Sequence, residues 1–258
     1  MPIAHRMSVF FTLALAFTWG GILGNLLWPS EFWLQPMNPL GPLIAAPLAL
    51  LMTEGRQGLA AWWRRVLNLR APAWVYATAV LGPLAVIAGA LALTGLSGAT
   101  IRPLDEISFL DALVVVPLIL LSGPLPEELT FRGYAQHELQ RVISPLSAAL
   151  IVGVGVVVWH LPLIVSGELA WPWTISIVAV SVVYAWLYRS GGSVWPVVLV
   201  HFVVNYFGSG FLGAAVSEPQ TQMLYAEIYA GFYVLWAMLI VATCGVGLRR
   251  GRNVPAEA

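Results

Sequence analysis

The stretch that decides the fold runs from residue 112 to residue 134 and reads ALVVVPLILLSGPLPEELTFRGY. Its first ten residues carry no charge, and Glu127, Glu128 and Arg132 follow shortly after them. An apolar run of this kind is typical of a segment that enters a bilayer, where charged side chains are costly unless they are paired or functional. The stretch therefore indicates a membrane protein with a charged site at the end of an apolar segment.

The composition of the whole chain agrees with this interpretation. Of its 258 residues, 59% are hydrophobic and 9% are charged, and the mean hydropathy is +0.83. All basic residues are arginines, they balance the twelve acidic residues, and no basic patch predicts a nucleic-acid partner. The single cysteine, Cys244, excludes an internal disulfide and a cysteine-based metal cluster, and the absence of lysine excludes Schiff-base and Ser-Lys chemistry.

Eight windows are apolar enough to be membrane helices, each of which needs about 20 residues. They are residues 8–28, 39–53, 73–97, 108–123, 146–165, 171–188, 194–213 and 222–248. We therefore expect an all-α, polytopic protein: a single integral-membrane domain over residues 1–258, built as a bundle of about eight transmembrane helices. The stretch GLAAWWRRVLNLR, residues 58–70, mixes aromatic and aliphatic side chains with three arginines and indicates a helix lying in the membrane interface.

The distribution of arginine predicts the orientation. If the N-terminus is cytoplasmic, Arg102 is the only arginine outside, while the outside loops hold acids such as Glu31, Asp105 and Glu168. Short cytoplasmic loops carry an excess of basic residues. We therefore expect both termini to be cytoplasmic and the protein to lie in a cell membrane.

The two prolines before the acidic pair predict a new helix. A helix that begins near Pro126 would hold Glu127 and Glu128 in its first turn. On that helix Glu128 and Arg132 are four residues apart and can pair, whereas Glu127 points about 100° away. The two acids are therefore expected to have different functions. The simpler alternative is that these charges only anchor a helix end at the membrane surface.

Two further windows contain polar side chains in apolar surroundings. The sequence GVVVWHLPL places His160 in one of them, and VVLVHFVVNYF places His201 and Asn205 four residues apart, on one helical face. A lone membrane histidine more often hydrogen-bonds a neighbouring helix than it catalyses a reaction. Three windows that all offer polar groups favour a common site.

These residue types suit the hydrolysis of an amide. A carboxylate with a histidine beside it can take a proton from water as the water attacks a carbonyl, and a second histidine with an amide can stabilise the resulting oxyanion. No metal or other cofactor is needed. The same residues leave a second possibility open, in which Glu127, His160 and His201 bind zinc.

Three other intramembrane protease signatures are not met. In HELQR, Arg141 stands where the zinc motif HExxH requires its second histidine. In FGSG, Phe207 stands where the rhomboid motif GxSG requires glycine, and the aspartyl motif GxGD does not occur.

In chain order, EELTFR (EExxxR), His160 and HFVVN (HxxxN) resemble the CAAX-processing and bacteriocin-processing family, known as CPBP or ABI proteins. The resemblance covers about residues 108–210, which would form the catalytic core. It implies a bundle of about eight membrane helices with a polar cavity facing the cytoplasm. One position departs from the family's frequent FxxxH motif, because Val156 stands four residues before His160.

The enzymes of this family are glutamic intramembrane proteases, so the resemblance implies a CAAX-protease-like endopeptidase acting on a membrane-associated or lipid-modified peptide. Glu127 would be the general base, assisted by His160. His201 and Asn205 would stabilise the oxyanion, while Glu128 and Arg132 would position the helix and the substrate. Two other classes remain open: a membrane scaffold or bacteriocin-immunity protein without catalysis, and a transporter that relays protons through Glu127 and His160.

Overall fold

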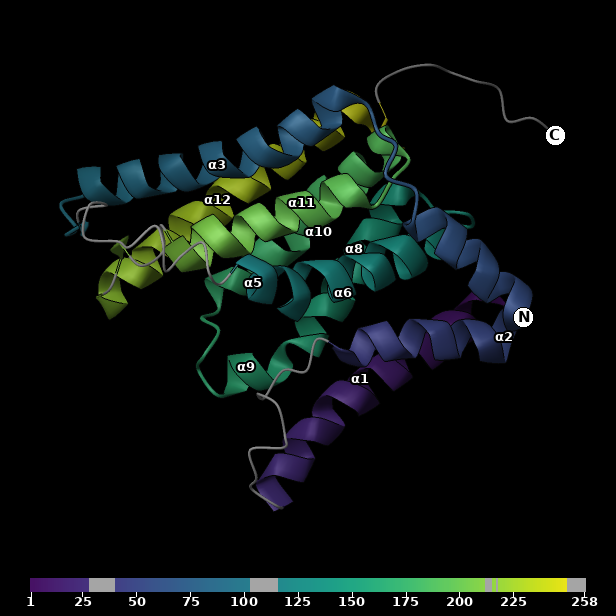
Figure 1. The fold of residues 1–258 in the computed structure, drawn as a ribbon. Helices are drawn as coiled ribbons and strands as arrows, with labels where there is room; N and C mark the ends of the chain where they lie inside the picture. Colours follow the sequence, from purple (N-terminus) through teal and green to yellow (C-terminus); the bar gives the residue numbers. More distant parts are fainter. Residues whose placement is uncertain (28–39, 103–115, 212–214, 217, 250–258) are drawn as a thin grey trace.

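The computed structural model describes residues 1–27, 40–102, 116–211, 215–216 and 218–249 (Figure 1). Over these ranges the chain forms helices and no strands. The helices are α1 (Ile3–Leu27), α2 (Leu40–Val66), α3 (Ala73–Leu96), α5 (Val116–Ser122), α6 (Pro124–Thr130), the π-helix η2 (Phe131–Gln136), α7 (His137–Leu139), α8 (Pro145–Trp159), α9 (Leu161–Val165), α10 (Pro172–Gly191), α11 (Trp195–Val203), the π-helix η3 (Val204–Phe211) and α12 (Pro219–Cys244).

The predicted all-α membrane fold is confirmed. Among the described helices, α3, α10 and α12 are long and apolar enough to cross a bilayer, and α8 and the segment from α11 into η3 are shorter apolar helices. The predicted window 146–165 is divided at His160, where α8 ends and α9 begins. The window 108–123 is described only from Val116, and Glu31 and Asp105 lie outside the described residues. The total of eight spans stays a prediction.

Helix α10 is at the centre of the bundle and packs against α8, α11 and α12, while α3 covers α11 and α12 from the other side (Figure 1). Helices α1 and α2 form a separate pair that joins the bundle through aromatic contacts. The ring of Phe10 in α1 packs edge-on against Phe131 and Tyr134 of η2. The core is therefore continuous from the first helix to the EELTFRGY segment.

The last part of α2 is where the sequence predicted an interfacial helix. Gly55, with φ 68°, bends α2 before this part. Trp62 is fully buried, and its Nε1 donates a hydrogen bond to the carbonyl oxygen of Leu129 at 3.1 Å. Trp63 beside it is exposed. The face of this part of α2 that carries Trp62 therefore holds the EELTFRGY segment in place. Only the face that carries Trp63 is available to the membrane interface.

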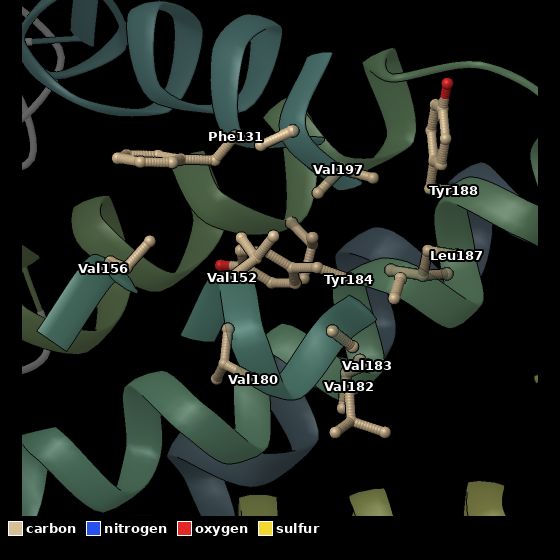
Figure 2. Close-up of a cluster of buried hydrophobic side chains, with 14 of the residues drawn as sticks. Phe131, Val152, Val156, Val180, Val182, Val183, Tyr184, Leu187, Tyr188 and Val197 are labelled. Atoms are coloured by element: carbon tan, nitrogen blue, oxygen red, sulfur yellow. The ribbon is translucent and has the colours of Figure 1, made fainter. Parts of the chain in front are cut away.

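Valine side chains fill the space between α8 and α10. Figure 2 shows Val152 and Val156 of α8 near Val180 and Tyr184 of α10, with Phe131 above them in this view. Branched side chains have few rotamers and pack closely between helices. This close packing fixes α8 and α10 relative to each other and so fixes the polar groups that they carry.

The bundle has two distinct ends. At the end called here the terminal end, Arg6 near the N-terminus lies 3.2 Å from Glu138, which also binds Arg141 at 3.0 Å. The start of α8 lies beside the end of α12, because Leu146 donates its backbone N–H to the carbonyl of Val246 at 3.1 Å. At the opposite, distal end, the loop of residues 166–171 and the first residues of α12 line a common pocket.

Candidate active site

A cavity of about 310 Å³ lies between α6, α8, α10 and α11. Its lining includes every residue that the sequence singled out, although these residues are up to 78 positions apart in the chain. They are Glu127, Glu128, Arg132, His160, His201 and Asn205. The fold thus brings the three motifs to one place.

Helix α6 sets the position of the acids. It begins at Pro124, directly after Gly123, two residues earlier than predicted, and holds Glu127 in its first turn. Glu128 lies beyond that turn, so the expectation that both acids share it was wrong for Glu128. Glu127 is 7% exposed and Glu128 is fully buried. Glu127 is therefore the more accessible of two acids that both line the cavity.

Gly123 was not predicted as a site residue, yet it lies against two of them. A Cβ atom at this position would be 3.2 Å from Nδ2 of Asn205 and 3.3 Å from Oε1 of Glu127. The side chains of Glu127 and Asn205 therefore come together over a glycine that leaves them room. The signal for this contact in the sequence was the glycine before Pro124. A glycine before a proline is equally typical of an ordinary helix start.

The predicted pair of Glu128 and Arg132 is confirmed. Nη1 of Arg132 donates to Oε1 of Glu128 at 3.0 Å. The same oxygen lies 2.7 Å from Nδ1 of His201, which comes from α11. A carboxylate only accepts hydrogen bonds, so Nδ1 of His201 carries a proton and its Nε2 is the nitrogen left for other partners.

Helix α10 supplies two partners of Arg132 that the sequence analysis did not identify. Nη2 of Arg132 donates to Oγ of Ser181 at 2.8 Å, and its guanidinium lies 4.8 Å from the ring centre of Tyr184. A planar guanidinium can make these contacts at once, whereas a lysine ammonium cannot. Arg132 is 3% exposed, so this pairing compensates the cost of burying its charge.

His160 marks the break between α8 and α9. Its Nδ1 lies 2.8 Å from the backbone carbonyl oxygen of Val156, one turn earlier. Because a carbonyl oxygen only accepts, Nδ1 is the protonated nitrogen and Nε2 carries the lone pair. The ring packs edge-on against Trp159, with centroids 4.7 Å apart. His160 is therefore held in one tautomer, with a basic nitrogen available at the cavity.

The zinc alternative finds no support in the placement of the described residues. Within the described ranges, no group of three or more histidine, cysteine, aspartate or glutamate side chains is placed to hold a metal ion. Glu127, His160 and His201 line one cavity but do not form such a group.

The residues that line the cavity differ in their exposure. Arg132, Tyr184 and Glu128 belong to the lining, and all three are buried. Glu168, in the loop between α9 and α10, is the exposed member of the lining. The cavity shares Glu168 and the half-buried Trp173 with the neighbouring pocket at the distal end. Glu168 is therefore the exposed side chain of a lining that is otherwise buried or half-buried.

The fold and the cavity together define a helical membrane protein with a buried polar site suited to hydrolysis. A protein-family model described as type II CAAX prenyl endopeptidase, Rce1-like, matches residues 109–207. The match confirms the family resemblance predicted from the motifs and spans all six predicted site residues. A search of curated proteins found no match to this chain.

Proposed function

We propose that this protein is an intramembrane endopeptidase that hydrolyses a peptide bond of a membrane-associated protein with a water molecule activated by Glu127. The observation that carries the proposal is the single cavity in which Glu127, His160, His201 and Asn205 meet. The family match supports the reaction class, since its description names an endopeptidase. The residue roles and the glutamic mechanism are part of the proposal.

The first step is the attack of water. Glu127 accepts a proton from a water molecule in the cavity as the water oxygen bonds to the carbonyl carbon of the scissile peptide. A positioned general base contributes about 10²- to 10⁴-fold to such a step. His160, whose Nε2 has a lone pair, accepts or relays the same proton. The proton then passes to the leaving nitrogen, the C–N bond breaks, and a carboxylic acid and an amine are released.

The second requirement is a partner for the negative oxygen of the tetrahedral intermediate. Asn205 can donate through Nδ2, which lies on the same side of Gly123 as Glu127. His201 can donate through Nε2 when both of its ring nitrogens are protonated. Its Nδ1 contact with Glu128 stabilises that positive charge. Donors that are fixed before the reaction begins stabilise the developing charge most effectively.

Glu128 and Arg132 hold this arrangement and do not react. One oxygen of Glu128 binds both Arg132 and His201, so the orientation of the histidine depends on the arginine. Ser181 and Tyr184 of α10 fix the arginine in turn. These four side chains are positioning residues.

The test compares cleavage by full-length protein purified in detergent. Wild type, Glu127→Gln and the control Glu227→Gln, an exposed acid on α12, are incubated with membrane-proximal and prenylated peptides, and products are identified by mass spectrometry. We expect Glu127→Gln to lose at least about 100-fold in rate at an unchanged unfolding midpoint, while Glu227→Gln keeps wild-type activity. Full activity in folded Glu127→Gln would contradict the proposal.

Two further arms separate the alternatives. Activity that survives a chelator supports the metal-independent mechanism. If a chelator abolishes the activity and zinc restores it, the same residues form the site of a metalloprotease. A scaffold or immunity protein would cleave no peptide in any sample, and its biological activity would survive Glu127→Gln.

A further inference from the structure

A second cavity, of about 720 Å³, lies at the terminal end, between the start of α3 and the ends of α10 and α12. It has no described lining residue in common with the active-site cavity. Its walls are mostly apolar and include Trp74 of α3, Trp186 of α10 and Trp236 of α12, whereas Ser190 and Arg249 supply polar groups. An apolar cavity with a few polar groups at one place is typical of a site for a small amphiphilic molecule.

Two arginines lie at the edge of this cavity without an acidic partner. Arg249 lines the cavity, and its charge acts on Arg189 in the last turn of α10. Neither arginine forms an ion pair within the described part of the chain, and Nε of Arg189 is buried there without a hydrogen-bond partner. The helix dipole favours one basic residue at the end of α10, but not a second one beside it. An anion between the two guanidinium groups would remove their repulsion.

The chain that follows α12 determines where Arg249 lies. Gly245, with φ 63°, ends the helix, and Leu248, with φ 47°, donates its backbone N–H to the carbonyl of Gly245 at 3.1 Å. The side chain of Leu248 is fully buried in the core. A leucine rarely adopts a positive φ, so this turn depends on the burial of its side chain. The next residue, Arg249, is therefore held beside the cavity by the fold, although its own side chain is exposed.

Tryptophan side chains form the apolar walls. The rings of Trp74 and Trp186 have their centroids 6.0 Å apart, and the ring of Trp236 packs over Gly82 of α3, where any Cβ atom would collide with it. Tryptophan is enriched at the depth of lipid head groups, because its ring is apolar and its N–H is polar. The lining follows α12 from Trp236 to Cys244, which is about 12 Å. The cavity therefore has a positively charged end and an apolar part that extends along the helices.

We propose that this second cavity binds an anionic phospholipid, with the phosphate between Arg189 and Arg249 and an acyl chain beside Trp236. A planar guanidinium donates paired hydrogen bonds to phosphate oxygens, and the hydroxyl of Ser190 in the lining supplies a further donor. Basic pockets between membrane helices bind acidic lipid head groups in this way. The site goes beyond the proposed function, because it takes part in no step of the hydrolysis.

The lipid site adjoins the helix that supports the active site. Trp186 and Ser190 of α10 are within about three turns of Ser181 and Tyr184, the two partners of Arg132 on the same helix. A lipid that contacts α3, α10 and α12 together binds the folded bundle and not the unfolded chain. We therefore expect a bound anionic lipid to raise the thermal unfolding midpoint.

The experiment measures lipid binding to the full chain, purified in detergent and freed of copurified lipid. Dioleoyl phosphatidylglycerol, the zwitterionic dioleoyl phosphatidylcholine and inorganic phosphate are titrated separately. Native mass spectrometry counts the bound molecules, and thermal unfolding is followed in parallel. Two double variants are compared with wild type: Arg189→Gln with Arg249→Gln, and the charge-conserving Arg189→Lys with Arg249→Lys. The control is Arg56→Gln, at an exposed arginine on α2.

We expect wild type to bind one phosphatidylglycerol in preference to phosphatidylcholine and to unfold at a higher temperature when it is bound. Each basic side chain near a membrane surface changes the affinity for anionic lipid by about fivefold, so the double glutamine variant should bind about 25-fold more weakly. The double lysine variant should keep most of the affinity, and Arg56→Gln should keep all of it. The unfolding midpoint without lipid shows which variants are folded.

Three results would overturn the proposal. They are equal binding of the two lipids, wild-type affinity in the double glutamine variant, and inorganic phosphate that stabilises the protein as much as phosphatidylglycerol does. The preference of wild type between the two lipids decides the question even if the double glutamine variant does not fold. Lipid binding requires no catalysis, so this result is independent of whether the protein cleaves a peptide.

Discussion

Nδ1 of His201 and Nη1 of Arg132 bind the same oxygen of Glu128, at 2.7 Å and 3.0 Å. One buried carboxylate oxygen therefore connects α6 to α11 and fixes the orientation of the histidine ring. The other ring nitrogen, Nε2, is the atom that the mechanism needs as an oxyanion donor.

His201→Asn tests that assignment. The asparagine amide nitrogen takes the place of Nδ1 and keeps the bond to Glu128, but no atom replaces Nε2. We expect kcat to fall by about 10²- to 10³-fold, the loss typical of one oxyanion donor, with little change in KM or in the thermal unfolding midpoint. His201→Gln, whose amide reaches further, is the comparison and should retain more activity. If His201→Asn kept the wild-type kcat, Nε2 of His201 would not be an oxyanion donor.

Gly123→Ala tests the approach of Glu127 to Asn205. A methyl group at this position would be 3.2 Å from Nδ2 of Asn205 and 3.3 Å from Oε1 of Glu127, so both side chains must shift by a few tenths of an ångström. Small displacements of reacting groups are costly, and we expect a loss of about tenfold or more in kcat/KM while the protein stays folded. Steady-state cleavage together with thermal unfolding measures both effects. Unchanged kcat/KM would show that the two side chains need not meet there.

Gly133→Ala tests why the motif EELTFRGY contains its glycine. An added Cβ would be 2.8 Å from Cγ1 of Val66 in α2, and overpacking of this kind costs about 1–3 kcal/mol of stability. We expect a lower unfolding midpoint, and a smaller loss in a Val66→Ala background. Gly231→Ala on α12 is the control, because a Cβ there meets no atom within 4 Å. Equal effects of the two glycine substitutions would exclude the clash as the cause.

The pH dependence of stability should depend in part on His137, at the terminal end. Burial, and then the charges of Arg65 and Arg141, lower the pKa of His137 to about 4. Glu138 lies 4.0 Å from its ring, but Arg6 and Arg141 already neutralise that carboxylate. The native state therefore keeps His137 neutral at a pH where the same histidine in the unfolded chain, whose ordinary pKa is about 6.5, already binds a proton.

It follows that this contribution to stability is fully present above about pH 6.5 and is lost as the pH falls toward 4. We expect the free energy of unfolding to decrease by up to about 1.4 kcal/mol per pH unit over this window, and His137→Gln to remove that slope. His5→Gln, at an exposed histidine, should leave the slope unchanged. Denaturant unfolding at several pH values measures this slope. A slope that persists in His137→Gln would come from other titrating groups.

The sequence predicted the parts of the site that follow from helix periodicity. Four-residue spacing was enough to pair Glu128 with Arg132 and to place His201 and Asn205 on one face. It could not predict Ser181 and Tyr184, because a serine and a tyrosine in an apolar helix have no distinctive spacing. Their function arises only when α10 packs beside η2.

The helix break at His160 was also missed, although Pro162 follows two residues later. The window was read as continuous because all its other residues are apolar, and hydropathy does not respond to a missing backbone N–H. The π-helix η2 had no signal in the sequence, since its geometry depends on contacts with α2 and α1.

The order in which the partners of Glu128 occur along the chain bears on how the protein is made. During synthesis Glu128 and Arg132 emerge together, one helical turn apart, so they can enter the bilayer as a neutral unit instead of as two isolated charges. Ser181 and His201 are translated about 50 and 70 residues later. A nascent chain therefore inserts the acid and the arginine as a pair but has no assembled cavity until its seventh predicted membrane segment has been delivered.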